Sequence, residues 1–351
     1  MPPKFSAHCG GHITLLFTVD KSSRLKRSQG SRGAGFAVQH GVHMVGTLQF
    51  IEENRPLQTM TGIDPDPKPV HHEVPEHRVS VIDMNGQQRE DITLYLDFLQ
   101  ACRDANLLRD HEWLELDVIL ECPTSQGFGM SAAGLMALGT VVKGLTERGT
   151  TEQYEKIAHR IEREHGAGLG DVLGLSVGGI ELRLEPGAPG WPGQAVSFAA
   201  EAPVLLVWDA SGERHTSTYI DDPVWQSSIT QAGNHSMNRL REETWGAHRW
   251  RDLLQEARAF SEASGMLGED LRARVYRLVL AAVQDLGFQA QIAARLCMLG
   301  SSVAIVPRTL EQPPSVNDLE ALQEELHAQG LQTLLTAFSE VKHRREVGSN
   351  R

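Results

Sequence analysis

The sequence predicts an α+β protein in which helices pack on mixed or antiparallel sheets in two lobes. Strand-like and helix-like segments mix without the strict alternation that builds a doubly wound parallel sheet. A proline- and glycine-rich stretch at 185–193, "EPGAPGWPG", suggests a boundary between an N-terminal lobe (1–195) and a C-terminal lobe (196–351). The 351 residues are enough for two such lobes and a sizeable core.

Composition excludes several classes of function. Hydrophobic residues make up 40% and charged residues 22%, as in ordinary soluble domains. The net charge of -12, with no long basic run, argues against nucleic acid or an anionic membrane as partner. The chain shows no signal-peptide layout and no apolar run of about 18 residues. Its four cysteines form no CxxC pair, so we expect a reduced, cytoplasmic setting without disulfides or a zinc ribbon.

The first part of the chain is predicted to consist of strands, polar loops and one helix. Residues 21–35 form a basic loop, and the Pro- and Asp-rich stretch 52–75, with His71 and His72, forms an irregular surface loop without an assigned role. Alternating or β-branched runs predict strands, and an amphipathic pattern predicts a helix over 91–106. The predicted strands cover 12–20, 35–50, 77–84 and 116–121.

Helices dominate the remainder. We expect helices over 132–147 and over 151–165, the second with Thr151 as N-cap. Residues 168–193 are predicted to contain a glycine-rich loop, a short helical turn and a strand, which ends at a Pro- and Gly-rich segment. Further on, we expect strands at 202–211, 301–308 and 331–341, helices within 225–286 and over 315–330, and a frayed tail at 342–351.

The stretch 121–133, "ECPTSQGFGMSAA", joins a strand to a helix through glycine-spaced backbone. The usual ligand of such a helix entrance is a phosphate group. A Walker A loop is excluded because no lysine follows the glycines. A dinucleotide fingerprint fits Gly127, Gly129 and Ala132 but lacks a second strand ending in an acidic residue about 20 positions on. A purely structural strand-to-helix turn is the plain alternative.

The whole string resembles the PxxxGxGSSAA loop of the GHMP kinase superfamily, which includes galactokinase, homoserine kinase and mevalonate kinase. The resemblance implies a GHMP kinase-like two-lobed fold whose loop wraps the phosphates of ATP. Ser131 would reach the metal or a phosphate, whereas Met130 replaces the first serine of the pattern. The implied ATP-phosphate residues are Pro123, Gly127, Phe128, Gly129, Met130, Ser131, Ala132 and Ala133.

Further blocks narrow the resemblance to the archaeal pantoate kinase family. They are "GGHITLLFTVD" near the N-terminus, "QGSRGAGFAVQHGV" at 29–42, "GLGDVLGLSVGGIELRLEPGAPG" at 168–190 and "LCMLGSSVAIV" at 296–306. The third GHMP motif, usually a run of glycines, is only "MLGSS" here. This family implies ATP- and Mg²⁺-dependent phosphorylation of the 4-hydroxyl of (R)-pantoate to 4-phosphopantoate in coenzyme A synthesis. The alternatives are a kinase for homoserine, mevalonate or a similar alcohol, and a GHMP-fold sensor without turnover; a homodimer is left open.

The resemblance also suggests which residues direct the reaction and bind the metal. Asp171, in "GLGDV", is the expected catalytic residue, although as a lone residue it fits a helix N-cap equally well. Glu162 would bind Mg²⁺ together with Ser131, since both offer hard oxygen ligands. The plain alternative for Glu162 is a solvated glutamate on a helix.

The carboxylate of the implied substrate calls for cationic partners. Arg183 in "IELRLE" is the main candidate, because an inward-facing arginine is costly without an anion; an outward, snorkelling arginine is the alternative. His159, at i, i+3 from Glu162, and Ser31 with Arg32 would complete the substrate site. Taken singly, His159 fits a satisfied or surface histidine and Arg32 a loop charge. The "HCGGH" at 8–12 is not expected to bind zinc.

Overall fold

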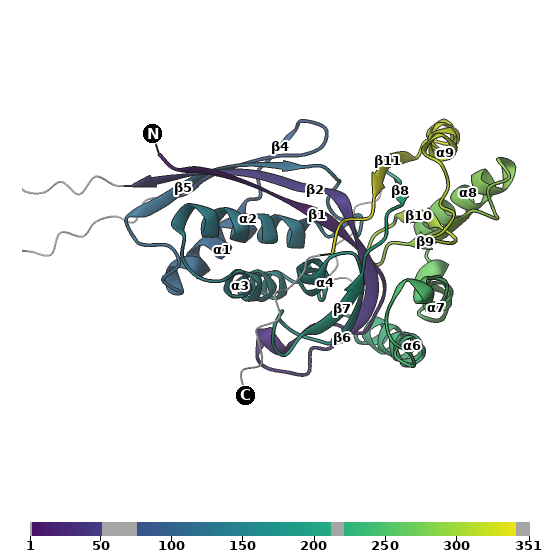
Figure 1. Ribbon diagram of the computed structural model, residues 1–351, viewed down its shortest axis with the longest axis horizontal. Coiled ribbons are helices and arrows are strands. Elements are labelled where there is room, and N and C mark those ends of the chain that lie inside the picture. Colours follow the sequence, from purple (N-terminus) through teal and green to yellow (C-terminus); the bar gives the residue numbers. More distant parts are fainter. Residues whose placement is uncertain (1, 51–75, 212–220, 342–351) are drawn as a thin grey trace, which may run out of the picture.

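Two sheets and their covering helices build the computed structural model, which describes residues 2–50, 76–211 and 221–341 (Figure 1). This confirms the α+β class with mixed and antiparallel sheets. The predicted loop at 52–75 and the predicted tail at 342–351 lie outside the described residues. Within the described residues no helix combines the length and the apolarity that a membrane crossing requires.

The larger sheet has seven strands in the order β4-β3-β5-β2-β6-β7, with β1 paired to β2. Only β3 and β5 run parallel among its pairs. Strand β2 is 18 residues long and pairs with β5 near one end and with β6 near the other, so it holds the sheet together. The strands are β1 (Lys4–Phe17), β2 (Gly33–Phe50), β3 (Arg78–Ile82), β4 (Gln88–Arg89), β5 (Glu112–Leu120), β6 (Ile180–Glu185) and β7 (Gln194–Phe198).

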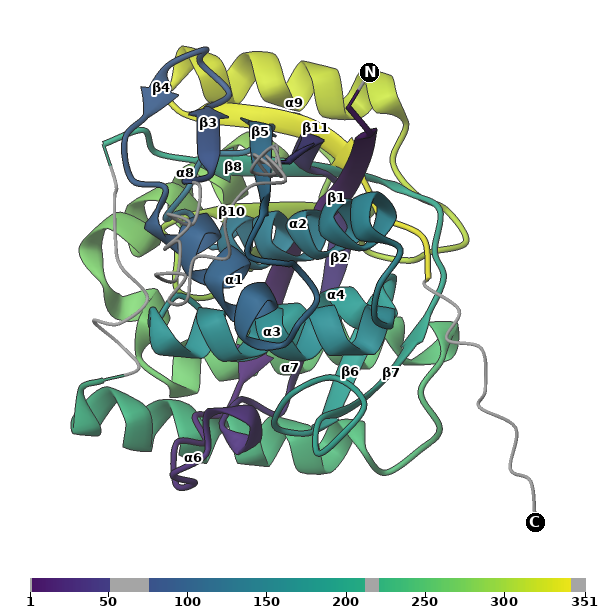
Figure 2. The ribbon, with the colours of Figure 1, turned by 90° about the vertical axis from the view of Figure 1, so that its left-hand side faces the viewer.

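Four helices cover one face of this sheet (Figure 2). Helix α2 packs directly on β1 and β2, because its many small residues, as in "SAAGLMALG", allow a close approach. The helices are α1 (Thr93–Asp104), α2 (Met130–Thr146), α3 (Thr151–Glu164) and α4 (Asp171–Val177). The predicted cap of α3 is wrong by one residue. Thr150 has extended backbone and forms a capping box with Gln153, whereas Thr151 is already helical.

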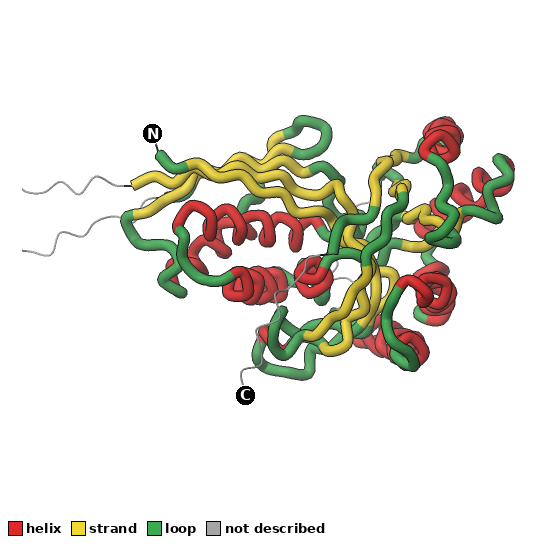
Figure 3. Tube along the Cα trace, in the orientation of Figure 1, coloured by secondary structure: helices red, strands yellow, loops and turns green. Residues whose placement is uncertain are grey.

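The smaller sheet is antiparallel, in the order β11-β8-β10-β9, and carries the C-terminal helices (Figure 3). Its strands are β8 (Pro203–Trp208), β9 (Ile292–Leu296), β10 (Val303–Pro307) and β11 (Gln332–Ala337). The helices are α6 (Pro223–Leu240), α7 (Trp250–Ala263), α8 (Asp270–Asp285) and α9 (Val316–Ala328). Strands β4, β7 and β9 are not among the predicted elements. The boundary at 195 falls inside β7, which still pairs with β6 of the larger sheet; the boundary itself stays a prediction.

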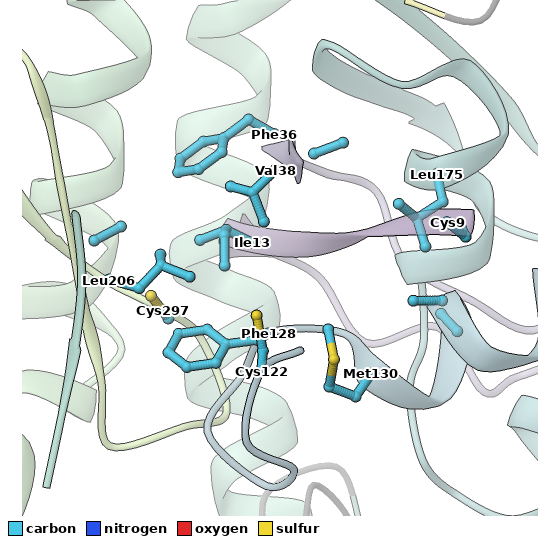
Figure 4. Packing of buried hydrophobic residues seen from close by; sticks show 14 of the residues in the cluster. Cys9, Ile13, Phe36, Val38, Cys122, Phe128, Met130, Leu175, Leu206 and Cys297 are labelled. Carbon is cyan, nitrogen blue, oxygen red and sulfur yellow. The ribbon is translucent and has the colours of Figure 1, made fainter. Parts of the chain in front are cut away.

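A continuous hydrophobic cluster joins the two sheets and reaches the predicted phosphate loop (Figure 4). Phe128 and Met130 of that loop belong to the same cluster as Ile13 of β1 and Val38 of β2. The Phe128 ring also meets the ring of Trp208, at the end of β8, edge to face with centroids 5.8 Å apart. Apolar packing of Phe128 and Met130 therefore holds the loop on the core, whereas its glycines Gly127 and Gly129 line the cleft described below.

Candidate active site

A cleft of about 330 Å³ lies where segments distant in sequence meet. Its walls come from β1, the loop between β5 and α2, the connection from α3 to α4, and the turn before β10. Most of the predicted site residues line it. These are Ser31, Pro123, Gly127, Phe128, Gly129, Met130, Ser131, Ala132, Glu162 and Asp171.

The glycines of the phosphate loop are required by its backbone and its neighbours. Gly127 and Gly129 have φ values of 78° and 67°, in the left-handed region that favours glycine. A Cβ on Gly129 would also lie 2.9 Å from the His12 side chain. Helix α2 begins at Met130, directly after this turn, so its first N–H groups lack helical partners and point toward the cleft. Such an entrance attracts anions, above all phosphate.

The third motif, "MLGSS", closes against this loop. Met298 and Leu299 line the cleft. A Cβ on Gly300 would lie 2.0 Å from the Gln126 carbonyl oxygen, so this position requires glycine. The serines that follow have bonding roles: Ser301 Oγ donates to Gln126 Oε1 at 3.2 Å, and Ser302 Oγ donates to the Gln126 carbonyl. These contacts fix the turn before β10 against the phosphate loop.

Two carboxylates from different helices face one point beside the loop. A Cβ on Gly168 would lie 2.4 Å from Glu162 Oε1 and 2.7 Å from Asp171 Oδ2, so both oxygens border the same small space. Glu162 Oε2 is buried without a hydrogen-bond partner among the described residues. Burial, and then the charge of Asp171, raises the pKa of Glu162 to about 8. A bound cation would relieve both the missing partner and the repulsion.

The side-chain oxygens of Glu162 and Ser131 fit a Mg²⁺ site. Mg²⁺ binds through one or two carboxylates and completes its octahedron with hydroxyls, waters and substrate phosphates. Glu162 and Ser131 line the same cleft as the phosphate loop and supply such oxygens. Among residues 2–50, 76–211 and 221–341, no group of three or more His, Cys, Asp or Glu side chains forms a metal cage. Such a cage suits other metals better than Mg²⁺.

Asp171 does not cap α4, because the N-cap is Gly170 and Asp171 is the first helical residue. Its Oδ1 instead bonds to His12 Nδ1 at 2.7 Å and accepts from Thr14 Oγ1 at 3.2 Å. Burial alone would raise the pKa of Asp171, but the bond and charge of His12, the charge of Arg183 and the bond from Thr14 hold it below its ordinary value. Asp171 is therefore ionised and oriented, with 19% of its side chain exposed toward the cleft.

His12 is a site residue that was not predicted. Both of its ring nitrogens bond to carboxylates, Nδ1 to Asp171 and Nε2 to Glu181 at 3.1 Å. Burial opposes its charge, but these two bonds raise the pKa of His12 overall. The available sequence signal was a histidine at the start of the strand-like run 12–17, "HITLLF", because a buried strand tolerates a polar side chain only with partners. A register irregularity between Gly10 and His12 separates it from His8, which bonds Glu121 at the surface.

Of the predicted substrate residues, Ser31 and Arg183 lie beside the catalytic loop. Ser31 lines the cleft, and a Cβ on Gly170 would lie 2.3 Å from Ser31 Oγ and 2.7 Å from Arg183 Nε, so Ser31 and Arg183 flank the same glycine. Arg183 is fully buried and faces inward. Its NH1 donates to Glu181 Oε1 at 2.7 Å, whereas Nε and NH2 have no hydrogen-bond partner among the described residues.

Arg183, His159, Arg32 and Ala133 do not line the cleft. His159 is buried on α3 and its Nε2 bonds the Gln29 carbonyl at 3.0 Å. Burial lowers its pKa to about 4, so the ring is neutral, and its Nδ1 lacks a partner among the described residues. The guanidinium of Arg32 donates to Asn234 Oδ1 at 2.8 Å, and Ala133 is buried within α2. Their predicted ligand contacts stay predictions.

The glycine-containing helix entrance and the two carboxylates beside it lie on a GHMP kinase-like fold, which solved structures share. A "Phosphotransferase related to CoA biosynthesis pathway" superposes with a TM-score of 0.70 and 22% identity over 99% of this chain and 100% of that one. Mevalonate pyrophosphate decarboxylase from Streptococcus pyogenes gives 0.63 at 12% over 98% and 99%. Mevalonate-3-kinase from Thermoplasma acidophilum gives 0.59 at 10% over 98% and 99%.

The sequence relatives of the chain are pantoate kinases. The pantoate kinase of Methanocaldococcus jannaschii is 24% identical over 309 residues, which cover 87% of this chain and 94% of that protein. The pantoate kinase of Thermococcus kodakarensis is 34% identical over 150 residues, or 42% of this chain and 47% of that protein, so this alignment spans under half of the relative. No family model matches the chain. The predicted resemblance to archaeal pantoate kinases is confirmed.

Proposed function

We propose that the protein is a cytoplasmic small-molecule kinase that phosphorylates the 4-hydroxyl of (R)-pantoate with ATP and Mg²⁺, giving 4-phosphopantoate for coenzyme A synthesis. One observation carries the proposal: the cleft brings the glycine loop, Ser131, Glu162 and Asp171 together. Similarity to pantoate kinases along 87% of the chain supports the choice of substrate.

Phosphoryl transfer needs a phosphate cradle, a divalent cation and a group that directs the attacking hydroxyl. The N–H groups at the start of α2 would hold the phosphates, with Ser131 and Glu162 holding Mg²⁺. When bound, Mg²⁺ supplies positive charge that neutralises the developing charge on the phosphate oxygens. Asp171, kept ionised by His12, orients the pantoate hydroxyl and accepts its proton as the oxygen–phosphorus bond forms and the bond to ADP breaks.

Arg183 is the proposed reader of the pantoate carboxylate. Its buried Nε and NH2 lack hydrogen-bond partners among the described residues. Nε lies beside Gly170 and NH2 beside Gly33, where a Cβ would collide with the guanidinium. An arginine with two free donors matches a carboxylate in planar, two-pronged fashion. Ser31, on the cleft side of Gly170, would add a hydroxyl contact. We also propose substrate contacts for His159 and Arg32, although neither lines the cleft.

Arg183→Lys and Arg183→Ala test this role. We expect kcat/KM for pantoate to fall in both variants, in the alanine variant by about 2–4 kcal/mol of transition-state stabilisation. The KM for ATP should stay nearly constant. A neutral analogue, pantoyl alcohol or pantoamide, should be a poor substrate of the wild type, and Arg183→Ala should hardly distinguish it from pantoate. Equal losses for pantoate and its neutral analogue would make Arg183 structural.

Turnover separates a kinase from a ligand sensor of the same fold. A kinase releases ADP only when ATP, Mg²⁺ and pantoate are all present, whereas a sensor shows ligand-induced thermal stabilisation alone. A thermal-shift titration followed by an ADP-release assay on the same sample distinguishes these outcomes. Stabilisation by pantoate without ADP release would contradict the proposed reaction.

A further inference from the structure

Glu181 on β6 connects two parts of the site without lining the cleft. Its Oε1 accepts from Arg183 NH1 at 2.7 Å and from His12 Nε2 at 3.1 Å. The three side chains are almost completely removed from solvent, at 0%, 0% and 1% exposure for Glu181, Arg183 and His12. Because one oxygen atom holds both cations, neither can shift without disturbing the other.

Besides Glu181, each cation has a second neighbour in the site: His12 contacts Asp171, and Arg183 lies beside Gly170. The imidazole of His12 is rigid, so fixing Nε2 also fixes Nδ1, which bonds Asp171 at 2.7 Å. The guanidinium of Arg183 is planar, so fixing NH1 also fixes Nε beside Gly170 and NH2 beside Gly33. Thr14 Oγ1 completes the contact between the two, 3.2 Å from Asp171 Oδ1 and 3.4 Å from Arg183 NH1.

The charges of this buried group balance. Since both nitrogens of His12 face carboxylate oxygens, both donate and the ring carries a positive charge. The cations His12 and Arg183 thus offset the anions Asp171 and Glu181. Removing the charge of Glu181 would leave two buried cations facing one carboxylate, an arrangement that buried ion pairs tolerate poorly.

We propose that Glu181 is a positioning residue that couples the hydroxyl-directing Asp171 to the carboxylate-reading Arg183. Through His12 it sets the orientation of Asp171, and by direct contact it sets the orientation of Arg183. This inference rests on the proposed function for the roles of those two residues. Its distinguishing consequence is that one residue remote from the substrates controls both the chemical step and the binding of pantoate.

Glu181→Gln is the principal test, because glutamine keeps the shape and loses the charge. The chain offers a matched control in Glu112, which is 2% exposed on β5 of the same sheet and bonds Arg148 NH1 at 2.7 Å. Glu112 does not line the cleft. Glu112→Gln therefore removes the charge of a buried glutamate–arginine pair away from the site, and it measures the effect of lost stability alone.

We expect Glu181→Gln to lower kcat and to raise the KM for pantoate, each by about tenfold or more, while the KM for ATP changes less than about twofold. Glu112→Gln should lower the melting temperature without either kinetic effect. Glu181→Asp, which restores the charge with a shorter reach, should recover part of both losses. Effects on pantoate KM should be non-additive between Glu181→Gln and Arg183→Lys, because the two changes act on one contact.

A spectroscopic readout keeps this inference separate from the choice of substrate. In protein labelled with ¹⁵N-histidine, both His12 nitrogens should give protonated, hydrogen-bonded signals without any ligand. Glu181→Gln should shift the Nε2 signal most, and Glu112→Gln should leave both signals in place. If pantoate is not turned over, these signals still test the coupling. Unchanged His12 signals in Glu181→Gln, or kinetics that match the Glu112→Gln control, would overturn it.

Discussion

At the scale of single residues, the site depends on two neighbouring carboxylates with opposite environments. Asp171 receives bonds from His12 and Thr14, which favour its charged form, whereas Glu162 is buried beside Asp171 with an unpartnered oxygen. The pKa of Asp171 is therefore lowered and that of Glu162 raised. Such a separation gives two carboxylates different tasks. It supports a hydroxyl-directing role for Asp171 and a cation-dependent one for Glu162.

Asp171→Asn should reduce kcat by about 100-fold or more, because an amide cannot accept the hydroxyl proton. ATP should still bind, since the phosphate loop is untouched. Steady-state ADP release gives kcat, and titration calorimetry with a nonhydrolysable ATP analogue gives the affinity. Near-wild-type turnover would return Asp171 to a structural role at the start of α4.

Glu162 predicts a pH effect on the metal-free protein. Its pKa rises from 4.5 to about 8 on folding, so its contribution to stability is complete below pH 4.5 and is lost as the pH rises through 8. Urea unfolding in EDTA should show this loss in the wild type and a smaller one in Glu162→Gln. A slope that is the same in both proteins would exclude Glu162 as its source.

The same group predicts the response to magnesium. Mg²⁺ binding near neutral pH should release a proton from Glu162, which calorimetry in two buffers of different ionisation enthalpy measures. Ser131→Ala and Glu162→Gln should each raise the Mg²⁺ concentration for half-maximal rate, on the order of tenfold. If both variants keep the wild-type magnesium dependence, the metal binds elsewhere.

At the scale of secondary-structure elements, hydrophobic periodicity and glycine or proline breakers predicted the long strands and helices but missed the short strands β4, β7 and β9. Strands β7 and β9 have five residues each and lack clear alternation, so their place depends on tertiary pairing with β6 and β10. Thr150 and Thr151 are equally good caps by residue type. Only the extended backbone of Thr150 decides between them.

Thr150→Ala should destabilise the protein by about 1 kcal/mol, because it removes the hydroxyl that accepts from the Gln153 N–H. Thr151→Ala is the matched control. Its hydroxyl accepts from Lys143 at the surface and caps nothing, so we expect an effect under about 0.5 kcal/mol. Chemical denaturation of both variants measures the difference. A larger cost for Thr151→Ala would contradict the observed cap.

At the scale of the whole molecule, the sequence motifs predicted which segments form the cleft but not the network behind it. The phosphate loop, Glu162 and Asp171 could be placed because each lies in a recognisable pattern. The inward direction of Arg183 and its sharing of Glu181 with His12 depend on how β6 pairs with β2 and how β1 lies beside them. The contact between His12 and Glu181 spans 169 positions and leaves no local signal in one chain, whereas Glu181 and Arg183 are only two positions apart.

The central claim is that this cleft transfers a phosphoryl group from ATP to pantoate. The most direct measurement is ADP release from ATP and Mg²⁺ with pantoate, homoserine, mevalonate and galactose in parallel, with the product examined by ³¹P NMR. We expect sustained turnover with pantoate, a phosphomonoester on its 4-oxygen, and a kcat/KM for the other alcohols lower by about 100-fold or more. No turnover with pantoate, together with turnover of another alcohol, would contradict the account and leave only the GHMP kinase fold.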